Sequence, residues 1–154
     1  MKIAITGTTR GLGKALADHF KNKGCHVIEL NRQDEKIESA TGCDVFINNA
    51  YGEGLQIELF DKLLTKVKKM IVMGSIASDY PDPKMPVYSQ HKKELKQQVL
   101  DAIKSKQTNT ADILLLQLTG ASYNNTRLIT KTIDFWLDNP TITLISFTPG
   151  EPNG

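Results

Sequence analysis

The chain of 154 residues is 40% hydrophobic and 23% charged, with a formal net charge of +2 at pH 7. This length and balance are typical of one globular domain, which we expect to span residues 1–154. So small a net charge does not support a nucleic-acid partner or a membrane surface. No run approaches the roughly 18 consecutive apolar residues that a membrane span needs.

The first residues and the cysteines indicate a compartment. The start "MKIAITG" enters a short apolar run directly, without the apolar core or cleavage site of a signal peptide. The two cysteines, Cys25 and Cys43, lack the spacing of metal ligands and are expected to pack as small hydrophobic side chains. These features predict a cytoplasmic protein without a metal site.

Short apolar runs alternate with stretches of helical period along the chain. Strands are predicted at residues 2–5, 26–30, 44–47, 70–73, 112–118 and 141–147. Helices are predicted over residues 11–24, over 55–69, from about residue 87, and over 126–138. This alternation predicts a three-layer α/β fold, with a parallel sheet that helices cover on both faces.

Segments whose residues could bind a ligand or take part in catalysis follow the predicted strands. They are "TGTTRGLG", "NR", "NNAY", "GS" and "LTG". In open parallel sheets, ligands bind at the carboxyl ends of the strands. The shared position of these segments therefore predicts one binding site at that edge of the sheet.

The loop "ITGTTRGLG" joins the first strand to the first helix. Its glycines permit a tight turn, and the N-terminus of the following helix offers free N–H groups to a pyrophosphate. The spacing is G-x-x-x-G-x-G and differs from the common dinucleotide fingerprint, so a purely structural turn is the alternative. We assign cofactor contacts in this loop to Gly7, Thr9, Arg10, Gly11, Leu12 and Gly13.

The end of the second strand bears on the choice of cofactor. An NAD site usually has an acidic residue here for the ribose hydroxyls, whereas this chain has Asn31 and Arg32, and Asp34 comes late. A guanidinium pairs well with phosphate oxygens, so Arg32, helped by Arg10, suits the 2′-phosphate of NADP(H). We predict NADP(H) in preference to NAD(H); the alternative is that both arginines are solvated.

Together these motifs resemble the short-chain dehydrogenase/reductase family, in its T-G-x-x-x-G-x-G branch. Besides the glycine loop, the chain has "NNA" at 48–50, Ser75 thirteen residues before Tyr88, Lys92 four residues later, and "TG" at 119–120. The resemblance covers residues 3 to about 126 and implies a Rossmann-like, doubly wound sheet. It implies catalysis by Ser75, Tyr88 and Lys92, and cofactor contacts from Tyr88, Lys92, Asn48, Asn49, Ala50 and Gly120.

A second Tyr-x-x-x-Lys pair, Tyr80 and Lys84, occurs in "YPDPK". Proline is poorly tolerated inside a helix, and Tyr80 follows Ser75 by only five residues. Tyr88 and Lys92 have no proline between them, and residues four apart are neighbours on a helix. The spacing therefore favours Tyr88 and Lys92 as the functional pair.

The resemblance implies a reaction that interconverts a small carbonyl compound and its alcohol. An isolated tyrosine has a pKa near 10, and an adjacent ammonium favours the phenolate. In this scheme Tyr88 is the acid or base, Ser75 bonds the reacting oxygen, and Lys92 supplies the charge. Each of the three could instead be structural, with Tyr88 packed at the surface and Ser75 only ending a strand.

The chain also departs from the family pattern. It is shorter than the usual members of the family. Residues 33–43 leave no room for one of the usual βα units, so the fold should be reduced by about one βα unit. No asparagine lies in 55–69, where the family has a catalytic one, Tyr51 replaces a glycine, and Thr119 replaces a proline. Asn48 and Asn49 could serve only to link neighbouring strand ends.

These departures leave alternatives open. One is a catalytically weak or inactive NADP(H)-binding sensor. A lesser one is an enzyme similar to sugar-nucleotide epimerases, although Arg10 and the missing C-terminal substrate domain disfavour it. The reduced size makes a homo-oligomer possible, because association would bury additional surface.

Overall fold

The protein forms one six-stranded sheet in the computed structural model, which describes residues 1–31, 36–52 and 54–148. The strand order is β2-β1-β3-β4-β5-β6, and every neighbouring pair is parallel. The strands are β1 (Lys2–Thr6), β2 (His26–Leu30), β3 (Val45–Asn48), β4 (Lys69–Ser75), β5 (Asp112–Leu118) and β6 (Leu144–Ser146). This arrangement confirms the predicted doubly wound α/β fold.

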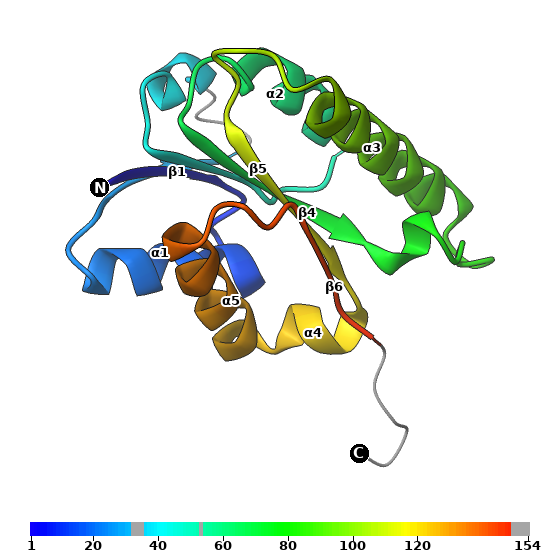
Figure 1. Cartoon of the computed structure of the whole chain (residues 1–154). Coiled ribbons are helices and arrows are strands. Elements are labelled where there is room, and N and C mark those ends of the chain that lie inside the picture. The colour runs from blue at the N-terminus through cyan, green and yellow to red at the C-terminus, as the bar shows by residue number, and fades with distance from the viewer. Residues whose placement is uncertain (32–35, 53, 149–154) are drawn as a thin grey trace.

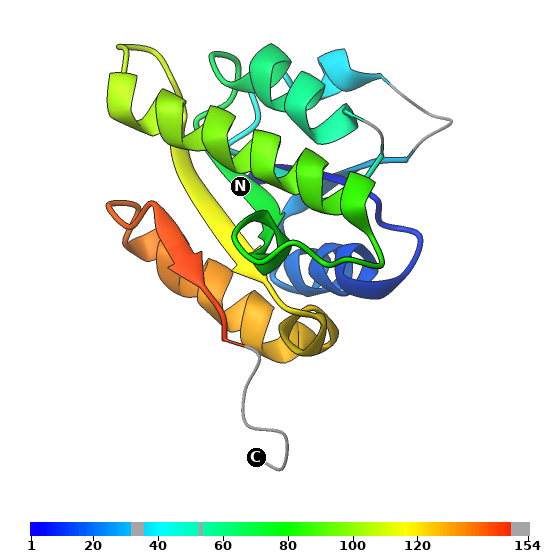
Figure 2. The same cartoon turned by 90° about the vertical axis from the view of Figure 1, so that its right-hand side faces the viewer.

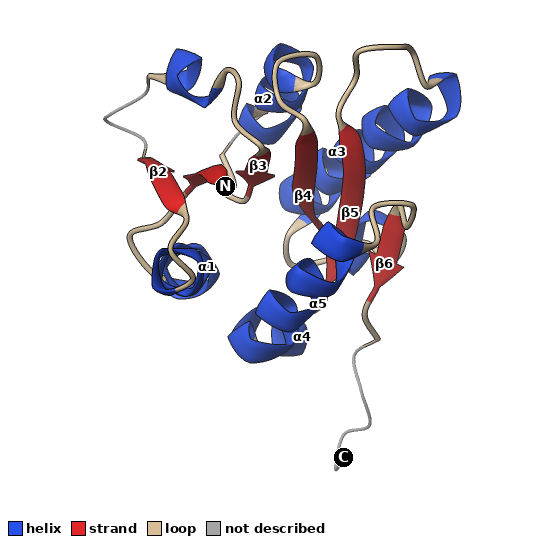
Figure 3. Ribbon diagram, turned by 60° about the vertical axis from the view of Figure 1, so that its left-hand side comes forward, coloured by secondary structure: helices blue, strands red, loops and turns tan. Residues whose placement is uncertain are grey.

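Helices cover both faces of the sheet (Figure 1). The α-helices are α1 (Gly11–Asn22), α2 (Leu55–Leu63), α3 (Pro86–Ser105), α4 (Gly120–Asn124) and α5 (Thr126–Asp138), and the 3-10 helices are η1 (Ile37–Ala40) and η2 (Ile76–Ser78). Helices α1, α4 and α5 lie on one face, and α2 and α3 lie on the other; Figures 2 and 3 show the two layers from other sides. No helix in the described part of the chain is long and apolar enough to cross a membrane.

Two hydrophobic clusters fill the space between the layers, because alternate residues of a strand point to opposite faces. Ile3 and Ile5 of β1 pack with α1 and α5, and Trp136 of α5 is fully buried in this cluster. Ala4, between them, belongs to the second cluster, under α2 and α3. The buried sheet places its polar strand ends at a single edge.

The segment between β2 and β3 confirms the predicted loss of a βα unit. The doubly wound order 3-2-1-4-5-6 has one more strand outside the second, whereas here the chain passes from β2 through η1 directly to β3. In the described residues, β2 therefore forms the outer edge of the sheet.

Helix α1 ends at Asn22, close to its predicted end, whereas two other predicted elements are clearly shorter than expected. The helix predicted over 55–69 ends at Leu63, because the next carbonyl groups bond to other segments: Leu64 O accepts from Ala111 N, and Lys66 O accepts from Gly42 N. The strand predicted over 141–147 is reduced to Leu144–Ser146, and the carbonyl of Ile142 instead accepts from the indole of Trp136 at 2.6 Å. Tertiary hydrogen bonds thus overrule local pattern at both places.

Candidate functional site

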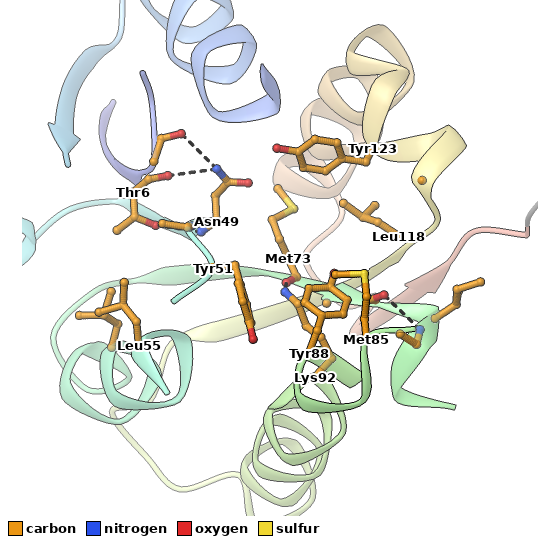
Figure 4. Close-up of a pocket in the computed structure, with 18 of the residues that line it drawn as sticks. Thr6, Asn49, Tyr51, Leu55, Met73, Met85, Tyr88, Lys92, Leu118 and Tyr123 are labelled. Atoms are coloured by element: carbon orange, nitrogen blue, oxygen red, sulfur yellow. Dashed lines mark hydrogen bonds between the residues drawn. The ribbon is translucent and has the colours of Figure 1, made fainter. Parts of the chain in front are cut away.

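A cavity of about 1450 Å³ lies at the carboxyl ends of the strands (Figure 4). Each of the strands β1 to β5 contributes a lining residue at or just after its end: Gly7, Asn31, Asn49, Ser75 and Thr119. The volume exceeds the roughly 300–1,000 Å³ of common small-molecule sites. It therefore has room for a ligand larger than a single small substrate.

The glycine loop brings the chain against the start of α1. Gly7 and Gly11 adopt left-handed backbone conformations, with φ of 71° and 59°, which glycine reaches without a steric penalty. A Cβ on Gly13 would stand only 1.8 Å from the carbonyl oxygen of Gly7. Arg10, at the N-cap of α1, makes no side-chain capping bond. The first N–H groups of α1 thus have no side-chain cap and, with the helix dipole, fit an anion.

The end of β2 supports this loop with a neutral side chain. Asn31 Oδ1 accepts from the backbone N–H of Thr8 at 3.0 Å and from its hydroxyl at 3.3 Å. The exposed Arg10 lines the cavity on the same side. Arg32, which we predicted as a 2′-phosphate ligand, lies outside the described residues.

Thr6 and Asn49 join the loops after β1 and β3. Thr6 Oγ1 accepts from the backbone N–H groups of Asn49 and Ala50, at 2.9 and 3.0 Å. Asn49 Nδ2 donates back to the carbonyls of Thr6 and Gly7, at 3.1 and 3.3 Å. This reciprocal bonding fixes one wall of the cavity, and it is the linking role that we considered as the alternative for Asn49.

Asn48 lies below the cavity and does not line it. Its side chain is fully buried, and Nδ2 donates to the backbone oxygen of Gln56 at 2.9 Å. The side chain of Leu12 is also remote from the cavity, because it is fully buried in the core with α1 and α5. Neither side chain lines the cavity, so Leu12 could meet a cofactor only through its backbone, and the contacts predicted for these two residues stay predictions.

The predicted triad lies together at the cavity. Ser75, at the end of β4, accepts from Ala77 N at 3.1 Å and keeps its hydroxyl proton for another acceptor. Tyr88 is in the first turn of α3, and Lys92 follows one turn later, with Nζ 5.6 Å from the centre of the Tyr88 ring. All three line the cavity. Among the described residues, the Tyr88 hydroxyl has no hydrogen-bond partner, so it is available to a ligand.

Lys92 is buried and is held by neutral oxygens. Its Nζ donates to Gln56 Oε1 at 2.6 Å and to the carbonyl of Met73 at 2.8 Å. It forms no ion pair with any carboxylate in the described part of the chain. Burial lowers the pKa of Lys92 from 10.5 to about 8, because desolvation disfavours the charged form. The ammonium is thus a positive charge without a buried counter-charge.

Aromatic and apolar side chains form much of the remaining wall (Figure 4). The rings of Tyr51 and Tyr88 meet edge to face, with centres 5.0 Å apart. The Tyr51 hydroxyl bonds to Nδ1 of His91 at 3.0 Å. Met85, Leu118 and Tyr123 also line the cavity. The site therefore combines polar groups from the strand ends with aromatic and apolar surface.

Most of the predicted site residues meet in this cavity. Those that line it are Gly7, Thr9, Arg10, Asn49, Ala50, Ser75, Tyr88, Lys92 and Gly120. Gly11 and Gly13 shape the loop beside it. Within the described ranges, no group of three or more His, Cys, Asp or Glu side chains could hold a metal ion.

Sequence reasoning did not foresee the roles of two residues at the site. Thr6 belongs to the T-G-x-x-x-G-x-G motif, but its bonds to Asn49 and Ala50 have no local signal, because these partners lie more than forty residues away. Gln56 did have a signal: with Leu59, Phe60 and Leu63 it follows the i, i+3, i+4, i+7 spacing of a buried helix face. A polar residue in register with an apolar stripe predicts a buried polar group with specific partners.

Comparison with protein-family models gives no match for this chain, and comparison with the sequences of curated proteins gives none either. Solved structures are similar in fold at low identity. A 3-alpha-hydroxysteroid dehydrogenase from Pseudomonas sp. B-0831, complexed with NADH, has a TM-score of 0.74 at 14% identity, with 95% of each chain covered.

Two further structures show the range of the similarity. A short-chain dehydrogenase/reductase from Serratia marcescens has a TM-score of 0.75 at 14% identity, with 95% of each chain covered. A UDP-N-acetylglucosamine 4-epimerase from Bacillus cereus has a TM-score of 0.72 at 16% identity, covering 98% of this chain and 79% of the epimerase. The chain therefore has the Rossmann-like fold of the short-chain dehydrogenases/reductases.

Proposed function

We propose that the protein is an NADP(H)-dependent oxidoreductase that interconverts a small carbonyl compound and its alcohol. The observation that carries this proposal is that Ser75, Tyr88 and Lys92 line the same cavity as the glycine loop and the start of α1. One cavity thus offers an anion site and an acid–base site together. The NADH complex of the Pseudomonas dehydrogenase, which has the same fold, agrees with a nicotinamide cofactor.

The residues present fit a dinucleotide. The uncapped N–H groups of α1 and the close approach of Gly13 to Gly7 suit a pyrophosphate. Arg10 suits a 2′-phosphate, and Asn31, a neutral side chain at the end of β2, does not repel one. When bound, the reduced nicotinamide supplies a hydride to the carbonyl carbon.

The protein's own groups would act on the substrate oxygen. During reduction, the Tyr88 hydroxyl donates its proton to the developing alkoxide, and the Ser75 hydroxyl donates a hydrogen bond to the same atom. The ammonium of Lys92, 5.6 Å from the Tyr88 ring centre, favours the phenolate that remains. In the reverse direction the Tyr88 phenolate accepts the proton.

The cavity wall suggests an apolar substrate. Met85 lies beside Tyr88, and Leu118 and Tyr123 add apolar surface to the same cavity (Figure 4). Aldehydes and ketones with alkyl or aryl substituents would bury this surface, whereas charged substituents would be desolvated there at a cost.

We also propose a cytoplasmic location, for which two free cysteines are the support, and leave a homo-oligomer as a proposal.

The test is turnover of NADPH and of NADH with a panel of apolar aldehydes and ketones. Tyr88→Phe should lower kcat by about 10²–10⁴-fold while dinucleotide binding is retained. Tyr80→Phe is the matched variant, since Tyr80 is 77% exposed, and it should have a much smaller effect. NADPH should bind more tightly than NADH.

Three outcomes would contradict parts of the proposal. Equal turnover in the wild type and Tyr88→Phe would remove Tyr88 from the chemistry. Tighter binding of NADH would refute the choice of NADP(H). Dinucleotide binding without turnover of any carbonyl would indicate a sensor, an alternative that the absence of an asparagine from α2 supports.

A further inference from the structure

Helix α2 presents one polar side chain to the interior. All nine of its residues are described, and the buried ones are Gln56, Leu59, Phe60 and Leu63. Gln56 is 4% exposed, in the first turn, on the side of the sheet that carries α3. An amide in such a place is costly unless its donors and acceptor are all bonded.

Every polar atom of the Gln56 side chain has a partner. Nε2 donates to the carbonyl oxygens of Asn48 and Met73, both at 3.0 Å. Oε1 accepts from Lys92 Nζ at 2.6 Å. The reversed amide would set an N–H donor against the ammonium and an oxygen against two carbonyls, so chemistry permits only the observed orientation. Gln56 therefore ties β3, β4 and α3 together at one point.

Few charged or titratable groups face the Lys92 ammonium. The phenol rings of Tyr88 and Tyr51, with centres 5.6 and 5.7 Å from Nζ, lie on its cavity side. His91 bonds to the Tyr51 hydroxyl, and Glu58 and Lys62 of α2 pair with each other on the cavity wall. Ser75 is the last residue of β4, and the bonds that α2 and β4 give to Lys92 come from neutral oxygens.

We propose that Gln56 is a positioning residue for Lys92. Its amide oxygen fixes the ammonium beside Tyr88 and supports the charge without neutralising it. A carboxylate in the same place would cancel the field that acts on Tyr88, and an apolar side chain would remove half of the polar support that the protein gives to the ammonium. Because an amide does not titrate, Gln56 offers Lys92 the same acceptor at every working pH.

This inference rests on the proposed function only for its catalytic consequence, so the experiment measures Lys92 directly. The protein is labelled with ¹³C-lysine, the Lys92 Cε signal is assigned by its loss in Lys92→Met, and its pKa is measured by NMR titration. Gln56→Met, which removes the acceptor, should lower the pKa of Lys92 by about one unit or more. Gln56→Glu, which adds an opposite charge, should raise it by a similar amount.

Gln117→Leu is the matched control. Gln117 is a buried glutamine of β5 that bonds to Ser78 and Asp79 and not to Lys92. Its replacement by leucine should therefore leave the Lys92 titration unchanged. Circular dichroism shows whether each variant is folded. If Gln56→Glu does not fold, the Lys92 titration in Gln56→Met tests the inference by itself. An unchanged Lys92 titration in the folded Gln56 variants would overturn the inference, whether or not any carbonyl is turned over. Where turnover is found, the pH at which it declines should move in the same direction as the Lys92 pKa.

Discussion

Gly13 of α1 packs directly against Gly7, at the end of β1. A Cβ on Gly13 would stand 1.8 Å from the carbonyl oxygen of Gly7, and 2.7 Å from Nδ2 of Asn49. The first of these atoms belongs to the backbone and cannot turn aside. The contact places the first turn of α1 against the sheet and so sets the position of the uncapped N–H groups.

Gly13→Ala should therefore separate the helix from the loop. We expect the free energy of unfolding to fall by about 1–3 kcal/mol, the usual cost of forcing atoms into a filled space, and dinucleotide affinity to fall with it. Urea denaturation and a binding titration measure the two effects. Gly120→Ala is the control, because a Cβ there would meet no described atom within 4 Å apart from its own neighbours in the chain and the backbone of α4, and it should change stability by no more than about 0.5 kcal/mol.

Thr6→Val keeps the shape of the side chain and removes its oxygen. The backbone N–H groups of Asn49 and Ala50 would then lose their acceptor. We expect a loss of about 2–3 kcal/mol in the free energy of unfolding, since a buried unpaired donor costs about 1–3 kcal/mol. Thr6→Ser, which retains the oxygen, should lose less.

The control for Thr6→Val is Thr130→Val. Thr130 is also buried, but its hydroxyl only donates to the carbonyl of Arg127 within the same helix. The two threonine variants are compared in one denaturation series. Equal losses at the two positions would show that the link between the loops adds nothing.

Lys92 gives stability a specific dependence on pH. Its folded-state pKa of about 8 lies below the unfolded value of 10.5, so between these values the unfolded chain binds more protons. The free energy of unfolding should therefore rise by about 3 kcal/mol as the pH increases from 8 to 10.5. Below pH 8 the cost of burying the charge is present in full.

Lys92→Met removes this contribution. Denaturation curves at several pH values should show that the variant's stability relative to the wild type falls by about 3 kcal/mol across the same window. The lost hydrogen bonds to Gln56 and Met73 do not titrate, so they shift the whole comparison without altering its slope. Parallel pH dependence in the two proteins would contradict the lowered pKa.

Carbonyl reduction should decline as the pH rises through about 8, because Lys92 then loses the charge that favours the Tyr88 phenolate. Lys92→Arg carries a charge that does not titrate in this range, so its decline should begin at higher pH even if its maximum rate is lower. Initial rates with saturating cofactor measure both profiles. An identical decline in the two proteins would assign it to another group.

The contrast between Tyr88 and Gln56 shows what could be predicted from the sequence. Tyr88 and Lys92 are neighbours on one helix, so their spacing paired them, and the resemblance to the family added Ser75, which ends a strand. Gln56 depends on Met73 and Lys92, which lie 17 and 36 residues away, and no local pattern specifies that contact. The early end of α2 has the same cause, since the carbonyl groups of Leu64 and Lys66, just after the helix, bond to residues that are distant in sequence.

All four tyrosines of the chain, Tyr51, Tyr80, Tyr88 and Tyr123, line the cavity. The one tryptophan, Trp136 of α5, does not line the cavity and is fully buried in the cluster that α1 and α5 form with the sheet, with its indole N–H bonded to Ile142. The tyrosines and the tryptophan therefore report on different parts of the molecule. Tyrosine absorbance and emission should respond to a ligand in the cavity, whereas selectively excited tryptophan should follow the packing of α5. Unlabelled protein can thus distinguish occupancy of the site from unfolding in a single optical experiment.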